Sequence, residues 1–347
     1  MTSLPKTMRA ALYNQAGGID LATSPLPVLV PGSAMLRLRA CGVAISDLIA
    51  FKAKLTSKLL HKLAGEIVQV TPQVDGLKVG DRVYINSYYH CGECPACRRG
   101  LTNLCDKRTY FYDGHQALSE YAMLPPKFLQ TGGATLVGNE VSFQDATQVG
   151  PLSNCLNTLR AVEFVPGSSA VVVGVGPMGL LHVMLLIVSG ASKVIACDVD
   201  EFRLQKATEF GADHAVNARS PEAIDEIQRV TCGGADVVIV ASGRPEAMVS
   251  SIKMAKPRGR IDFFGGVALQ EGGASFVVDP NPIHYKELKI VGTYASLLDD
   301  YRVAAELITS RKLSPSKLDT HFFDFDHFQE ALSVVDDPRA LRVLIHL

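Results

Sequence analysis

Two patterns of hydrophobic and polar residues divide the chain. Up to about residue 145, short segments alternate apolar and polar positions, as in Met-Leu-Arg-Leu-Arg between residues 34 and 40. Glycine and proline turns separate these segments, and further strands are expected at 66–70 and 79–85. Alternation with a period of two is typical of half-buried strands. Many short strands with such turns indicate a β-rich first domain.

After residue 165 the pattern changes to short β-branched runs that alternate with helical segments. A parallel sheet requires this order, because a crossover must connect each strand to the next. The expected strands are 170–173, 194–198, 237–241, 261–265 and 288–292, and the expected crossover helices are 201–210, 221–230 and 245–255. The remaining residues predict helices at 301–310 and 326–335 and a final strand at 341–347.

A glycine motif follows the first strand of this second region. Gly174, Gly176 and Gly179 have G-x-G-x-x-G spacing, with a strand before them and an apolar helix after them. The first glycine permits a tight turn, the second lets the backbone approach a pyrophosphate, and the third lets the helix pack on the strand. The helix N-terminus offers unpaired N–H groups to phosphates. The motif in this context predicts a dinucleotide site.

The second strand ends in Asp198, about twenty residues past the last glycine. Its carboxylate is expected to accept hydrogen bonds from the adenosine ribose and to repel a 2′-phosphate, which favours NAD over NADP. Arg203 leaves NADP open, because an arginine can accept a 2′-phosphate. The predicted cofactor-binding residues are the three glycines, Pro177, Met178, Asp198 and Arg203.

Four of the eight cysteines form a cluster, Cys91, Cys94, Cys97 and Cys105, with the spacing C-x2-C-x2-C-x7-C. Four thiolates at this spacing can surround one zinc ion tetrahedrally and leave no position for a substrate. Four cysteines also ligate iron–sulfur clusters, and unligated thiols are the third alternative. We predict a structural zinc site, which contributes folding energy and carries out no chemistry.

Composition excludes several other classes of partner. The formal net charge is -1, so no electrostatic bias favours nucleic acid or an anionic membrane. The most apolar run, 180–188, is too short to span a bilayer, and the first residues lack the apolar core of a signal peptide. We expect a soluble, cytoplasmic protein of about two domains that acts on a small molecule.

Several short motifs accompany the glycine and cysteine motifs: Val79-Gly-Asp-Arg-Val, Ser119-Glu-Tyr, Pro151-Leu and Phe210-Gly-Ala-Asp. Together they make the chain resemble the medium-chain dehydrogenase/reductase family of zinc alcohol dehydrogenases. The branch of sorbitol, other polyol and threonine dehydrogenases is the most similar. The resemblance implies an α/β protein with a β-rich, chaperonin-10-like catalytic domain, an inserted Rossmann domain of doubly wound parallel sheet, and a homodimer or homotetramer.

The corresponding domain boundaries follow from the change of pattern. We expect the catalytic domain at 1–153, with a zinc lobe at about 90–108. The NAD-binding domain is expected at 154–293, and residues 294–347 are expected to return to the catalytic domain.

The resemblance also implies a second, catalytic zinc, held by a Cys, a His and a Glu or Cys, with an open position for the substrate oxygen. In this chain Ala44 and Gly150 stand at the Cys and at the third ligand. His61 keeps the ligand histidine, but Lys62 replaces the adjacent glutamate. Alanine and glycine have no donor atom, so we expect no catalytic zinc. Rescue by Cys41 or Cys155 would need a shifted backbone.

Three residues are candidates for the chemical step. Ser46 matches the family's hydroxyl that takes and passes on the substrate proton, although Ile49 replaces the histidine that many members use next. His61 is either a general acid/base or a residue that hydrogen-bonds a backbone carbonyl. Lys62 either stabilises negative charge on a substrate oxygen or is a solvated or paired lysine.

These observations favour an NAD(H)-dependent oxidoreductase that transfers hydride to or from a small polar substrate without a catalytic zinc. A secondary alcohol or ketone of polyol or sugar type is the first expectation. A metal-free reductase of an activated C=C or C=N bond is the alternative within the same class. A non-catalytic NAD-binding sensor or assembly protein is the alternative outside it.

Overall fold

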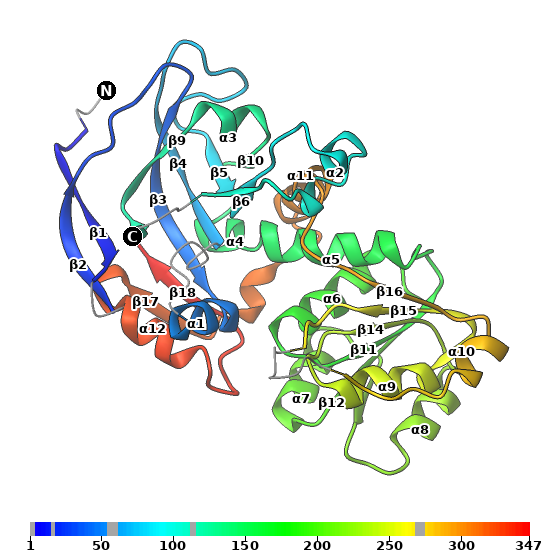
Figure 1. Cartoon of the computed structure of the whole chain (residues 1–347). Coiled ribbons are helices and arrows are strands. Elements are labelled where there is room, and N and C mark those ends of the chain that lie inside the picture. The colour runs from blue at the N-terminus through cyan, green and yellow to red at the C-terminus, as the bar shows by residue number, and fades with distance from the viewer. Residues whose placement is uncertain (1–3, 15–17, 54–61, 112–115, 268–274) are drawn as a thin grey trace. The chain divides into compact units, whose positions relative to one another are not determined.

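The computed structural model describes residues 4–14, 18–53, 62–111, 116–267 and 275–347 (Figure 1). The chain forms two compact units. The first contains Met1–Pro151 and Ser296–Leu347, and the second contains Leu152–Ala295. The polypeptide therefore leaves the first unit once and returns to it. His61 and its predicted roles lie outside the described residues.

The first unit is built on a mixed sheet with the strand order β10-β5-β4-β3-β18-β17, and β9 also pairs with β3. Its strands are β3 (Ala34–Val43), β4 (Lys62–Val70), β5 (Arg82–Ile85), β9 (Tyr121–Leu124), β10 (Ala134–Val137), β17 (His321–Asp324) and β18 (Val343–His346). Two smaller sheets contain β1 (Thr7–Tyr13), β2 (Ile19–Pro25) and β8 (Gln116–Ser119), and β6 (Tyr88–Tyr89) with β7 (Thr109–Tyr110).

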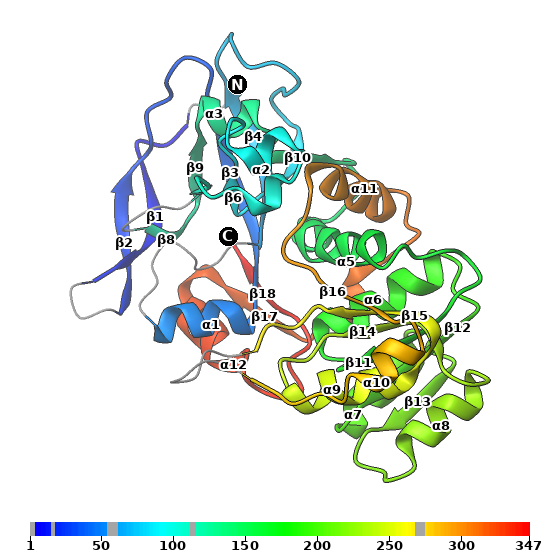
Figure 2. The same cartoon turned by 45° about the vertical axis from the view of Figure 1, so that its right-hand side comes forward.

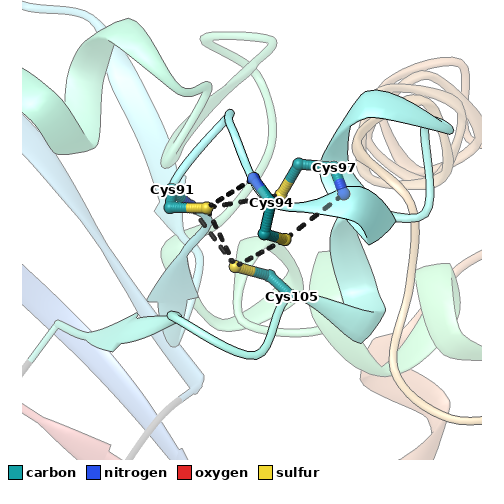
Figure 3. A group of neighbouring side chains, drawn as sticks. All are labelled: Cys91, Cys94, Cys97 and Cys105. Carbon is teal, nitrogen blue, oxygen red and sulfur yellow. Dashed lines mark hydrogen bonds between the residues drawn. The ribbon is translucent and has the colours of Figure 1, made fainter.

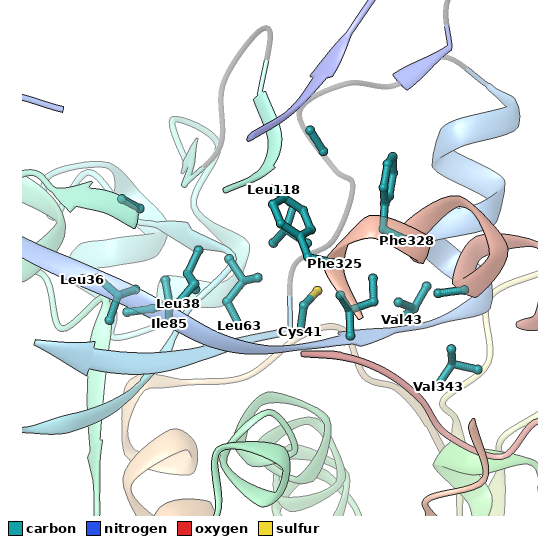
Figure 4. Close-up of a cluster of buried hydrophobic side chains, with 14 of the residues drawn as sticks. Leu36, Leu38, Cys41, Val43, Leu63, Ile85, Leu118, Phe325, Phe328 and Val343 are labelled. Carbon is teal, nitrogen blue, oxygen red and sulfur yellow. The ribbon is translucent and has the colours of Figure 1, made fainter. Parts of the chain in front are cut away.

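One face of this sheet forms the core of the unit. Figure 4 shows Cys41 among apolar side chains of β3, β4, β5 and β18, with Phe325 and Phe328 packed against them. The opposite face lies against α4, which contacts β3, β4 and β5. The helices of this unit are α1 (Ile45–Lys52), α2 (Pro95–Arg98), α3 (Pro126–Gln130), α4 (Phe143–Ala146), α11 (Leu298–Thr309) and α12 (Phe328–Val334).

The second unit contains a six-stranded parallel sheet with the order β13-β12-β11-β14-β15-β16, which is the doubly wound Rossmann order. Its strands are β11 (Ser169–Val173), β12 (Lys193–Asp198), β13 (His214–Asn217), β14 (Ala235–Val240), β15 (Ala255–Phe263) and β16 (Lys289–Gly292). Helices flank this sheet (Figure 2): α6 (Pro177–Val188), α7 (Glu201–Glu209), α8 (Ala223–Val230), α9 (Pro245–Met254) and α10 (Asn281–Tyr285); the longer α5 (Val149–Ala161) precedes β11.

The predicted α/β class is confirmed, and two of the details that differ from the sequence pattern have a clear physical reason. β13 was not expected, because a four-residue edge strand with the sequence His-Ala-Val-Asn carries little apolar signal. The strand expected at 79–85 begins only at Arg82, because Gly80 has a φ of 93° and the Asp81 carboxylate accepts the Lys78 N–H in a turn. In the described part of the chain, no helix is long and apolar enough to cross a membrane.

Candidate functional site

The glycine motif forms the turn between β11 and α6. Gly174 has a φ of 86°, a conformation that favours glycine, and a Cβ at Gly179 would overlap the Gly174 carbonyl oxygen. α6 begins at Pro177, and its N-cap residue Gly176 has no side chain to satisfy the first N–H groups. The turn therefore places glycine backbone without side chains next to the uncapped N–H groups of a helix N-terminus, an arrangement that fits a bound pyrophosphate.

Asp198 ends β12 next to this turn and is almost fully buried. Its Oδ2 accepts the Val175 N–H at 2.7 Å, and its Oδ1 accepts the N–H groups of Val199 at 2.7 Å and Asp200 at 3.1 Å. The carboxylate therefore holds the glycine turn in place, a role that the sequence did not indicate. Arg203 lies beside the same turn, with Nη1 3.8 Å from the position of a Cβ at Gly176.

The structure thus brings the predicted cofactor residues together around the carboxyl ends of β11 and β12. Ligands bind at this edge in doubly wound sheets. These residues are Gly174, Gly176, Pro177, Met178, Gly179, Asp198 and Arg203.

The four cysteines of the predicted zinc lobe converge on one point (Figure 3). Their sulfur atoms all lie within 4.8 Å of one another. The Sγ–Sγ distances are 3.9 Å for Cys91–Cys97, 3.9 Å for Cys94–Cys105 and 3.6 Å for Cys91–Cys105. Sulfur atoms at about 2.3 Å from one tetrahedral zinc lie about 3.8 Å apart. The cluster therefore fits a closed zinc site.

Backbone amides around the cluster favour the thiolate of Cys91. The N–H groups of Glu93 and Cys94 donate to Cys91 Sγ at 3.4 and 3.3 Å, and the Cys97 N–H donates to Cys94 Sγ at 3.5 Å. The Glu93 amide is the main reason why the pKa of Cys91 falls to about 7. Burial raises the pKa of Cys97 to about 12 and also raises the pKa of Cys105. Metal ligation requires the thiolate, so a bound cation would be needed to deprotonate these two cysteines.

The predicted position of the first catalytic metal ligand lies at the start of α1. Ala44 is the N-cap residue, and its N–H donates to the buried Asp47 carboxylate at 2.7 Å. Asp47, the third residue of α1, therefore caps the helix through the Ala44 N–H. Ser46 lies exposed in the first turn, and Ile49 is 59% exposed one turn further on. The Ser46 hydroxyl is accessible to a small molecule.

Lys62 begins β4, opposite Gly42 on β3. A Cβ at Gly42 would lie 3.3 Å from Lys62 Cβ and 3.4 Å from Thr147 Oγ1, so the lysine stem runs over the glycine. The residue keeps some exposed surface, but burial around its ammonium lowers the pKa of Lys62, while nearby Asp47 opposes the shift. Among the described residues, no hydrogen bond or ion pair to this ammonium is found.

The place of the third ligand is filled by another residue. A Cβ at Gly150 would overlap Tyr84 Oη and would lie 2.7 Å from Tyr84 Cζ. Tyr84 is 2% exposed, and its ring stacks on Tyr301 with ring centroids 6.0 Å apart. Sequence reasoning missed Tyr84. The glycine was a signal, because a side chain lost from a packed interior leaves a space that a neighbour fills.

The two cysteines considered as substitute ligands lie elsewhere. Cys41 points into the apolar core (Figure 4), and Cys155 Sγ contacts the Met178 carbonyl oxygen at 4.0 Å within the second unit. Burial raises the pKa of both thiols. Across the described ranges, the cysteine cluster of the zinc lobe is the one group of three or more potential metal ligands. Neither cysteine joins a second group of metal ligands among the described residues, and His61 lies outside them, so the absence of a catalytic zinc stays a prediction.

Comparisons with known proteins agree with this architecture. Residues 177–310 match the family model of the zinc-binding dehydrogenases, and residues 30–131 match that of the alcohol dehydrogenase GroES-like domain. A protein of Aspergillus fumigatus named "Probable D-xylulose reductase A" is 30% identical over 341 residues, which cover 92% of this chain and 91% of the relative. The L-threonine 3-dehydrogenase of Pyrococcus abyssi is 29% identical and covers 96% of both chains.

A solved structure named as a short chain alcohol dehydrogenase of E. coli CFT073, complexed with NADH, is 25% identical, with a TM-score of 0.87. It covers 99% of this chain and 100% of its own. The fold and the two motif sites define a two-domain dehydrogenase or reductase with a Rossmann unit. The chain belongs to the zinc alcohol dehydrogenase family of medium-chain dehydrogenases/reductases.

Proposed function

We propose that this chain transfers hydride between NAD(H) and a small polar secondary alcohol or its ketone, of polyol or sugar type, without a catalytic zinc. The observation that carries the proposal is the combination of an intact dinucleotide turn with two donorless ligand positions, Ala44 and Gly150. Such a protein keeps the machinery for hydride transfer and has lost the usual Lewis acid.

The residues of the second unit support NAD as the cofactor. When bound, NAD supplies the carbon atom that accepts or donates hydride. The N-terminus of α6 would hold the pyrophosphate, and the remaining lone pairs of the Asp198 carboxylate would accept hydrogen bonds from ribose hydroxyls. Holding the two reacting carbons in contact lowers the activation barrier. The reduction is several kcal/mol and reaches about 7–11 kcal/mol in the best-oriented cases.

Three residues would then handle the substrate oxygen. The exposed Ser46 hydroxyl is placed to take the alcohol proton and pass it to water. Lys62 offers an ammonium without a protein partner among the described residues, which would stabilise negative charge on that oxygen. His61 remains a proposed general acid/base. The four cysteines with one zinc ion would stabilise the lobe around 90–108.

A substrate panel tests this proposal. Purified protein is assayed at 340 nm with NAD and sorbitol, xylitol, 2,3-butanediol and threonine, and with NADH and the matching ketones, simple enones and cyclic imines. Turnover of alcohols and ketones supports the proposal. Turnover of enones or imines alone replaces it with C=C or C=N reduction. NADH binding without any turnover supports a non-catalytic sensor. Light scattering on the same sample tests the proposed homodimer or homotetramer.

A further inference from the structure

The missing third ligand has been replaced by a specific polar group. The space where a side chain at Gly150 would begin is occupied by the Tyr84 hydroxyl. Stacking of the Tyr84 ring on Tyr301 holds this hydroxyl in place, with an angle of 21° between the ring planes. Burial raises the pKa of Tyr84 above its ordinary range, so the phenol stays protonated and remains a hydrogen-bond donor.

Lys62 lies on the same face of the same sheet. Lys62 and Ala64 share one face of β4 because side chains alternate along a strand, and Ala64 pairs directly with Tyr84 on β5. Lys62 and Tyr84 are therefore diagonal neighbours on adjacent strands, a relation of roughly 7–8 Å that long and aromatic side chains span. The face is the one that α4 covers, because the Arg82 guanidinium, two residues from Tyr84, lies over the Phe143 ring of α4 at 4.6 Å.

We propose that the Tyr84 hydroxyl and the Lys62 ammonium form a two-donor site for one substrate oxygen, in place of the metal. The inference rests on the proposed function and deepens it, because it names the pair of residues that would bind the substrate oxygen. Two donors on the same face of adjacent strands can reach one oxygen and stabilise the negative charge that it gains, as a ketone oxygen does when hydride reaches its carbon. The C=C bond of a simple alkene offers no such atom. The site therefore requires a substrate with an electronegative atom that gains charge, and the substrate panel decides between ketones, enones and imines.

The surroundings of Lys62 agree with a site that a ligand completes. A buried ammonium is costly unless a hydrogen-bonding partner or charge compensates it. Asp47 is the acid that most strongly opposes the lowering of the Lys62 pKa, but one of its carboxylate oxygens already accepts the Ala44 N–H in the cap of α1. Arg342 adds a second positive charge, although Asp319 at 2.6 Å pairs with it. Asp145 also lies 4.0 Å from Arg342, so carboxylates offset both cations. What the Lys62 ammonium lacks among the described residues is a hydrogen-bond partner, which a substrate oxygen would supply.

The test measures binding of isobutyramide, an unreactive carbonyl compound, to the full-length protein saturated with NADH. The readouts are the quenching of NADH fluorescence and the shift in melting temperature. We compare the natural protein with Tyr84→Phe, which keeps the stacked ring, and with Lys62→Met, which keeps the aliphatic stem. Tyr301→Phe and Lys52→Met are the matched controls, because the first changes the stacking partner and the second removes an exposed lysine.

We expect each site variant to weaken isobutyramide binding about tenfold, with NADH affinity unchanged and the controls like the natural protein. Unchanged binding in Tyr84→Phe and Lys62→Met would overturn the two-donor site, as would absence of binding to the natural protein. If a site variant unfolds, the other one decides. If isobutyramide binding depends on both residues but the substrate panel shows no turnover, the two-donor site stands and the proposed oxidoreductase function fails.

Discussion

At the residue scale, two buried side chains, Asp198 and Tyr84, shape the proposed sites through contacts with the backbone. Asp198 has two tasks, because its carboxylate fixes the glycine turn through three N–H groups and is also the proposed acceptor for the ribose. The position of Asp198 at the end of β12 could be predicted from its spacing to the glycine motif. The role of Tyr84 could not be predicted, because its contact with Gly150 joins residues that are distant in the sequence and that only the fold brings together.

Replacement Asp198→Asn tests the first of these residues. The amide cannot accept from all three backbone donors, and it no longer repels a 2′-phosphate. We expect the Kd for NADH to rise at least tenfold and the preference for NADH over NADPH to fall by a similar factor, both measured by fluorescence titration. Asp200→Asn, two residues further on at the N-cap of α7, is the control, because it changes a side chain and leaves the Asp200 N–H that Asp198 accepts. An unchanged cofactor preference would contradict the proposed role.

A second prediction concerns the proton path. Ser46→Ala removes the exposed hydroxyl and leaves the Asp47 cap of α1 intact. We expect kcat for the best alcohol of the panel to fall about 10²-fold, with the Kd for NAD and the melting temperature unchanged. Steady-state kinetics together with cofactor titration checks this outcome. A kcat within twofold of the natural value would remove Ser46 from the mechanism.

At the scale of elements, α6 carries a buried histidine in the middle of the dinucleotide unit. His182 is fully buried, its ring meets Phe264 edge-on with centroids 4.7 Å apart, and neither ring nitrogen has a hydrogen-bond partner in the described part of the chain. Burial lowers the pKa of His182 to about 3. In the unfolded chain the pKa is about 6.5.

The sign of the resulting pH effect is fixed. Below about pH 6.5 His182 is protonated in the unfolded chain but stays neutral in the folded protein. The free energy of unfolding therefore falls as the pH drops from about 6.5 towards 3. The slope approaches about 1.4 kcal/mol per pH unit. We expect the loss of unfolding free energy between pH 7 and pH 5 to be about 2 kcal/mol smaller in His182→Leu, measured by urea unfolding. An equal loss in His182→Leu and in the exposed control His327→Gln would contradict this.

The zinc lobe is the second element whose stability can be tested. Cys94 begins α2 as its N-cap and contributes one of four converging sulfur atoms. Cys94→Ser leaves three thiolates, and we expect it to lose the zinc and to lower the melting temperature by several degrees. Cys232→Ser, at an exposed cysteine outside the cluster, should change neither. Full zinc content in Cys94→Ser would show that the four cysteines do not hold the metal together.

At the scale of the whole molecule, the sequence was most informative where function requires a local pattern. The glycine turn and the cysteine cluster each occupy a short segment, so both could be found from spacing, and the structure brings the residues of each together. Strand 214–217 was missed because a short edge strand has no strong pattern. The filled ligand position was missed because it depends on packing between Tyr84 on β5 and Gly150 in the first turn of α5.

The absence of catalytic zinc is the central claim, and the metal content of active protein tests it most directly. Purified, catalytically active protein is analysed for zinc and iron per chain by inductively coupled plasma mass spectrometry. We predict one zinc and no iron per chain, and activity that survives a weak chelator. Two zinc ions per chain, with activity lost when the second is removed, would contradict it and restore the zinc-dependent mechanism of the family.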